Sequence, residues 1–99
     1  MKVIFSKFAK QELDDATQYY EIEYLGVGKR FREEIRKAAK RISEYPEAWS
    51  VEQGEIRKYI LHSFPYKLLY SIEINHIFII AVAHQHRKPD YRLDNNELK

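Results

Sequence analysis

The chain has 99 residues, a length at which one domain with one hydrophobic core is expected. Hydrophobic residues make up 44% and aromatic residues 14% of the sequence, which excludes an intrinsically disordered chain although 32% of the residues are charged. The absence of cysteine excludes disulfides, thiol chemistry and cysteine-ligated zinc, and the formal net charge of +2 does not by itself indicate a nucleic-acid partner.

We expect a single domain over residues 1–92 and a loose polar tail over residues 93–99. The longest apolar run, residues 77–83, is about a third of the length that a membrane-spanning helix needs. Lys2 and Lys7 interrupt the N-terminal segment before it can form the apolar core of a signal peptide. The sequence therefore predicts a cytoplasmic protein without a membrane partner.

The first half of the chain predicts a short strand and two helices. Residues 3–5 are apolar and partly β-branched, and Ser6 can cap a following helix by accepting a backbone N–H. Helical spacing over residues 7–25 is carried by Ala9, Leu13, Ala16, Tyr20 and Tyr24. A second helix from about residue 29 to Pro46 is marked by Val27, Phe31, Ile35, Ala38 and Ile42. The glycines at 26 and 28 predict a tight turn and an antiparallel helical hairpin.

The two predicted helices differ in charge. Residues 11–25 contain five carboxylates and no basic side chain, whereas residues 29–41 contain seven Lys or Arg and only two Glu, at positions 33 and 34. We interpret these as two solvated faces that attract one another. The alternative is that the basic helix serves as a binding face.

After Pro46 the apolar period changes from 3.6 to 2, which indicates strands. Residues 56–61 and 66–74 alternate, and Asn75 with His76 forms a break short enough to close a hairpin. Residues 77–83 are apolar on both faces and predict a central strand that is covered on each side. The predicted fold class is α+β, in the order β-α-α-β-β-β, with the helical hairpin packed on a small, mostly antiparallel sheet.

The polar side chains that the core does not need suggest one kind of chemistry. A metal-independent ribonuclease requires an acid, a base and cations around the developing phosphorane charge. The residue types for it are present in Arg57, His84, His86, Arg87 and Tyr91. Each histidine also has a structural interpretation as a hydrogen-bonded or surface residue, and each arginine as a surface ion pair or sheet-edge charge. Both interpretations remain open.

The same segments hold candidate binding cations, namely Arg57, Lys58, Arg87 and Lys88. If the strands pair in sequence, Arg57 lies on the sheet that leads to residues 84–92, and the strand register decides whether they share an end. His84, His86 and Asp90 do not provide three or four convergent ligands, so no metal is expected, and no other cofactor is indicated.

An ordered set of segments resembles a known family. The segments are VIFS at 3–6, EYP at 44–46, IR at 56–57, PYKLLY at 65–70 and HxHRxPxY at 84–91. Together they resemble the RelE/ParE superfamily, the toxins of bacterial type II toxin–antitoxin modules, over residues 3–92. The resemblance implies a compact α/β toxin that is bound and neutralised by a partly disordered antitoxin, and hence a toxin–antitoxin hetero-oligomer.

The superfamily implies two alternative activities. RelE-like members cut mRNA on the ribosome with a cluster of Lys, Arg and a C-terminal Tyr or His, whereas ParE-like members poison DNA gyrase. Three features resemble the ParE branch: the C-terminal segment with Arg87 and Pro89, the long first helix, and the modest basicity of the strand around Arg57. His86 stands where many relatives carry Arg, and this departure keeps the nuclease alternative open. A third alternative is a non-toxic relative that only binds its antitoxin.

The antitoxin is expected to dock on exposed apolar surface, either by adding a strand or by laying a helix in a groove. Tyrosine and tryptophan are enriched at binding hot spots, although single exposed aromatics are also ordinary. The candidates for this contact are Tyr19, Tyr24, Tyr45, Trp49 and Tyr59.

Overall fold

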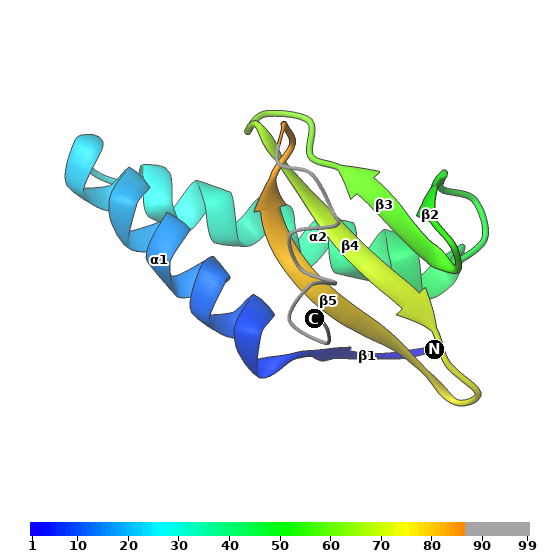
Figure 1. The fold of residues 1–99 in the computed structure, drawn as a ribbon. Helices are drawn as coiled ribbons and strands as arrows, with labels where there is room; N and C mark the ends of the chain where they lie inside the picture. Colours follow the sequence, from blue (N-terminus) through cyan, green and yellow to red (C-terminus); the bar gives the residue numbers. More distant parts are fainter. Residues whose placement is uncertain (87–99) are drawn as a thin grey trace.

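The structure, a computed structural model, describes residues 1–86. Its elements follow one another as β1 (Lys2–Phe5), α1 (Lys7–Glu23), α2 (Val27–Glu44), β2 (Val51–Gln53), β3 (Ile56–Ile60), β4 (Tyr66–Ile72) and β5 (His76–His84). The helical hairpin packs on a sheet, as Figure 1 shows. The predicted α+β fold class is confirmed, and β2 is a short additional strand that the sequence did not predict.

The strands form one sheet in the order β1-β5-β4-β3-β2. β1 pairs with β5 in parallel, and the other neighbours pair antiparallel. β5 therefore lies inside the sheet, as its apolar sequence predicts. Its residues Ile77, Ile79 and Val82 belong to the core shared with the helices, and Ala81 and Ala83 are buried as well.

The start of α1 also completes the edge of β5. Ser6 is the N-cap, and its Oγ accepts the Ala9 N–H at 2.9 Å and donates to the Ile80 carbonyl at 2.9 Å. The ladder between β1 and β5 ends at Ile79, so the groups of β5 beyond it need other partners. Glu12 supplies one, because its Oε1 accepts the Val82 N–H at 2.7 Å. The predicted cap is confirmed, with an added role in the sheet.

The turn of the helical hairpin lies two residues earlier in the chain than the sequence predicted. α1 ends at Glu23 and α2 begins at Val27, two residues before the predicted start. Gly26 has a left-handed φ of 87°, and a Cβ on Gly28 would lie 2.6 Å from the Thr17 carbonyl oxygen. The carboxylate of Glu21 accepts the N–H groups of both glycines, at 2.9 and 3.0 Å. This carboxylate replaces the side-chain cap that Gly26 lacks.

The turn between β4 and β5 differs from its prediction. The last paired residues are Ile72 and Ile77, and the turn covers residues 73–75 rather than 75–76. Glu73 N–H donates to the His76 carbonyl at 2.8 Å, and Ile74 is fully exposed. The alternating pattern extended through Ile74 because apolar alternation does not distinguish the last strand residue from an exposed turn residue.

No helix in residues 1–86 is long and apolar enough to cross a membrane.

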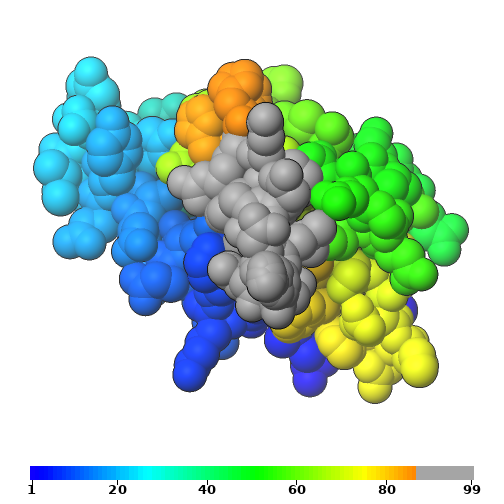
Figure 2. Space-filling view, in the orientation of Figure 1, coloured from blue at the N-terminus to red at the C-terminus, as the bar shows by residue number. Residues whose placement is uncertain are grey.

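The hairpin end projects to one side of the molecule (Figure 2), where Tyr24 and Leu25 are exposed. Beneath the hairpin, an aromatic cluster connects the helices to the sheet. It consists of Tyr20, Phe31, Phe64 and Tyr66, with ring centroids 4.9–6.2 Å apart.

Candidate functional site

The two adjacent cations of β3 lie on opposite faces of the sheet. Arg57 reaches the loop that follows α2, on the helix side, whereas Lys58 pairs with Glu52 on the other face. Successive strand residues alternate between faces, so this separation follows from the period of the strand itself. The two candidate binding cations Arg57 and Lys58 therefore face different sides of the sheet.

Arg57 holds the loop between α2 and β2. Its Nη1 donates to the carbonyl oxygens of Trp49 at 2.7 Å and Glu47 at 3.3 Å. Tyr70, opposite Arg57 on β4, donates its hydroxyl to the Pro46 carbonyl at 2.6 Å. Burial raises the pKa of Tyr70 to about 12, against the opposing charge of Arg57. The role of Arg57 in this geometry is to position the loop.

The face of the sheet away from the helices carries an ion cluster. Glu52 Oε2 lies 3.2 Å from Lys67 Nζ, Glu52 Oε1 lies 3.3 Å from Lys58 Nζ, and Lys67 is only 5% exposed. Burial raises the pKa of Glu52, but the hydrogen bonds and charges of Lys67 and Lys58 outweigh it, so the pKa lies below its ordinary value. The carboxylate neutralises one of the two cations.

His84 lies at the end of β5, far from Arg57. It pairs with Tyr66, which in turn accepts the N–H of Leu61. Arg57 lies four residues earlier in β3, about 13 Å along the strand direction. The two residues share the sheet but not an end. The remaining candidates, Arg87, Lys88, Pro89 and Tyr91, lie outside the described residues.

The two histidines at the end of the described chain lie close together. Their ring centroids are 5.5 Å apart, and the ring of His84 is 5.6 Å from that of Tyr66. His86 N–H points to Nδ1 of His84 at 3.4 Å. Within residues 1–86, no three His, Asp or Glu side chains gather as metal ligands.

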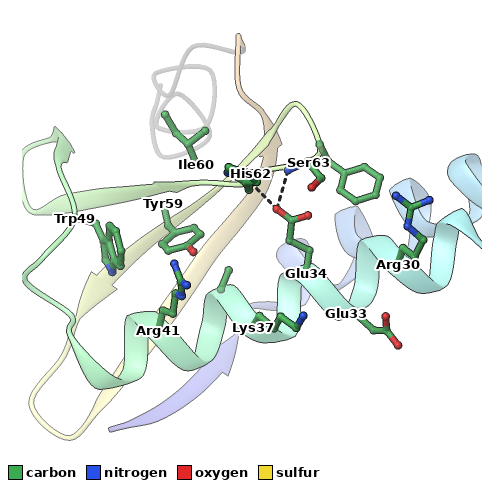
Figure 3. A pocket seen from close by; sticks show the side chains of 12 residues that line it. Arg30, Glu33, Glu34, Lys37, Arg41, Trp49, Tyr59, Ile60, His62 and Ser63 are labelled. Carbon is green, nitrogen blue, oxygen red and sulfur yellow. Dashed lines mark hydrogen bonds between the residues drawn. The ribbon is translucent and has the colours of Figure 1, made fainter.

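A groove of about 680 Å³ lies between α2 and β3 (Figure 3), and we call it the α2–β3 groove. It is lined by Arg30, Glu33, Glu34, Lys37, Ala38, Arg41, Trp49, Tyr59, Ile60, His62, Ser63 and Phe64. Sequence reasoning did not find it, because its walls are far apart in the chain. The sequence feature that could have indicated this groove is the helical spacing of the basic residues at positions 30, 37 and 41.

Aromatic side chains form one wall of the α2–β3 groove. Trp49 and Tyr59 pack edge to face, with ring centroids 4.7 Å apart. The Nε1 atom of Trp49 is buried and finds no acceptor in the described part of the chain. Of the predicted contact aromatics, Tyr19, Tyr24 and Tyr45 are exposed, whereas Trp49 and Tyr59 are half-buried at this groove.

A smaller hollow of about 440 Å³ lies between α1 and the end of β5. Its lining is apolar and acidic and includes Phe8, Glu12, Asp15, Tyr19 and His84. It is thus opposite in charge to the cationic wall of the α2–β3 groove.

A family model described as the ParE toxin of the type II toxin–antitoxin system, parDE, matches residues 3–89. The chain belongs to the ParE toxin family. This confirms the RelE/ParE resemblance and its ParE-like branch. A search of curated proteins gave no significant match.

Solved structures share the fold of this ParE-family chain. One is the chromosomal ParDE toxin–antitoxin system from P. aeruginosa, with a TM-score of 0.73 and 16% identity, covering 85% of this chain and 95% of that chain. Another is the isolated E. coli RelE toxin, with a TM-score of 0.62 and 23% identity, covering 96% of this chain and 95% of that chain. At these identities the likeness concerns the fold.

Proposed function

We propose that this ParE-family protein is a toxin that inhibits DNA gyrase by protein–protein contact, without chemistry of its own. An antitoxin encoded beside its gene neutralises it. Membership of the ParE family supports the toxin assignment. The ParDE neighbour, which is a toxin–antitoxin system, supports the antitoxin partner.

The observation that favours inhibition by contact is the engagement of the sheet cations within the fold. A phosphate-cleaving site needs cations that can approach the developing charge of the substrate. Here Arg57 donates to two backbone carbonyls, and Lys58 and Lys67 share the carboxylate of Glu52. The separation of Arg57 from His84 along the strands favours the same conclusion, because acid, base and charge stabiliser must reach one phosphate.

Purified protein and purified gyrase test this proposal. We expect loss of supercoiling of relaxed plasmid and accumulation of gyrase–DNA cleavage complexes, with a DNA-damage response when the toxin is expressed in bacteria. Plasmid incubated with the protein alone controls for nicking. Supercoiling at an unchanged rate in the presence of excess folded protein would refute gyrase as the target.

The alternative is a ribosome-dependent mRNA endonuclease, and the proximity of two histidine rings at 5.5 Å favours it. Histidine can supply both the acid and the base near neutral pH. Cleavage of message on translating ribosomes that disappears in the His86→Ala, Tyr91→Phe double variant would support this activity. Cleavage that persists in the variant would exclude those two roles. Harmless expression without an antitoxin would instead identify a non-toxic relative.

A further inference from the structure

We propose that the α2–β3 groove is the docking site for an acidic segment of the antitoxin that carries an apolar anchor. The proposal rests on the antitoxin partner of the proposed function. It adds where on the toxin the partner binds and which chemistry the bound segment has.

The first argument is the geometry of the cationic wall. Arg30, Lys37 and Arg41 lie on one stripe of α2, seven and four residues apart, and all three line the groove. At 1.5 Å per residue the stripe is about 16 Å long. That length matches about five residues of extended peptide or about three turns of helix. Figure 3 shows Arg41 pointing from α2 towards Tyr59 and Trp49 across the groove.

The second argument is that these cations are available. Within residues 1–86, Arg30, Lys37 and Arg41 form no ion pair; the only ion pair between the two helices there joins Arg32 and Asp14. The predicted attraction between an acidic and a basic helix is therefore confined to one pair in this part of the chain.

Three carboxylates of the two helices accept backbone N–H groups and, among the described residues, do not pair with these cations. Glu21 holds the hairpin turn and Glu12 binds the edge of β5. Glu34, which lies on the stripe itself, accepts the N–H groups of His62 at 2.5 Å and Ser63 at 2.9 Å (Figure 3). The groove therefore keeps a positive wall that an acidic partner can neutralise.

The third argument is the aromatic wall. Trp49 and Tyr59 offer a half-buried apolar surface of the kind on which interface anchors pack. The buried Trp49 N–H lacks an acceptor among the described residues, and a carboxylate or carbonyl of a bound peptide can supply one. One bound peptide can therefore both cover the apolar surface of Trp49 and Tyr59 and accept the Trp49 N–H.

An acidic peptide fits this groove better than a nucleic acid does. Glu33 and Glu34 stand between the cations on the same helix face, and they repel a continuous phosphate backbone. A peptide can space its carboxylates to match Arg30, Lys37 and Arg41. Binding of RNA at this groove is therefore an outcome that the test must be able to reveal.

The test compares two charge reversals on one helix. The Lys37→Glu, Arg41→Glu variant changes the groove, and the Arg36→Glu, Lys40→Glu variant makes the same charge change at residues that do not line it. The probe is the purified product of the adjacent reading frame, with any tryptophan replaced by phenylalanine. Trp49 is the only tryptophan of the chain, so its emission reports occupancy of the groove.

We expect the dissociation constant of the groove variant to rise by about tenfold or more and that of the control by less than about threefold, with a change in Trp49 emission on binding. Raised salt should weaken binding to wild type more than binding to the groove variant. Thermal melts check folding. If the groove variant does not fold, the Gln versions of both pairs replace the Glu versions.

Equal weakening in both variants, or unchanged Trp49 emission, would overturn the docking site and leave the proposed function standing if gyrase is still inhibited. A probe that fails to bind wild-type toxin would overturn both the neutralising partner and the site. Displacement of the bound probe by an equimolar single-stranded RNA would assign the groove to nucleic acid and overturn the proposal.

Discussion

Arg57 and Tyr70 face each other across β3 and β4, and both donate hydrogen bonds to carbonyls of the loop that joins α2 to β2. The same loop carries Trp49, which forms a wall of the α2–β3 groove. Two side chains in the middle of the sheet thereby set the position of a groove residue. Variants of Arg57 or Tyr70 therefore test whether these hydrogen bonds hold the loop that carries Trp49.

Replacing Arg57 with alanine should lower the free energy of unfolding by about 1–3 kcal/mol, because a charged hydrogen bond to the Trp49 carbonyl is lost. Urea unfolding at neutral pH measures the change. Arg36→Ala, on the exposed face of α2, is the control and should stay within about 0.5 kcal/mol of wild type. A loss no larger than that of the control would contradict the loop-positioning role.

Replacing Glu52 with alanine should lower the free energy of unfolding by about 3 kcal/mol, because it leaves the buried Lys67 without its carboxylate. The Glu52→Leu, Lys67→Met double variant removes both charges and should recover most of the loss. Because the folded pKa of Glu52 lies below its ordinary 4.5, its stabilising contribution is complete above that pH and disappears as the pH falls through the folded value.

The pH dependence of Glu52 is measured by urea unfolding of wild type and Glu52→Ala at neutral pH and at about pH 3. The difference between the two proteins should shrink at the lower pH. A difference that stays constant would show that the carboxylate is not ionised in a favourable pair.

The raised pKa of Tyr70 predicts a loss of folding stability at alkaline pH. Its folded pKa of about 12 exceeds the ordinary value of 10.0, so its contribution to stability is complete below about pH 10 and is lost as the pH rises towards 12. Alkaline titration of phenolate absorbance should show one tyrosine fewer in the late phase for Tyr70→Phe. Tyr45→Phe, at an exposed position, is the matched control for the loss of one hydroxyl. Identical late phases in wild type and Tyr70→Phe would refute the burial of this hydroxyl.

Gly28→Ala should destabilise the helical hairpin by about 1–3 kcal/mol, because the new Cβ meets the Thr17 carbonyl oxygen at 2.6 Å. Thermal unfolding measures the loss. Gly54→Ala separates crowding from backbone strain, since Gly54 has a φ of 57° with nothing within 4 Å of a Cβ, and it should cost about 1 kcal/mol. A smaller loss at Gly28 than at Gly54 would show that the helices move apart at little cost.

The sequence predicted the features that depend on neighbouring residues. Ser6 was recognised as a cap, and the spacing of Phe31, Ile35 and Ile42 placed the buried face of α2 correctly. The strand β2 was missed because three residues are too few to show a period, and its pairing with β3 is irregular between Val51 and Gln53.

The site was predicted less well because it depends on contacts between distant segments. Arg57 was identified as a residue of interest, but its partners at Glu47 and Trp49 are fixed by the path of the loop. No pattern in the sequence indicates that Glu52 is the carboxylate that pairs with Lys58. The opposite faces of Arg57 and Lys58 were predictable from strand alternation alone.

The parallel pairing of β1 with β5 joins Lys2 to His76 and Phe5 to Ile79. The first strand can therefore pair with its neighbour only after residues 76–79 have left the ribosome, and the sheet cannot close before then. Such distant pairing slows folding. Products that stop before His76 lack the partner of β1 and cannot form this closure.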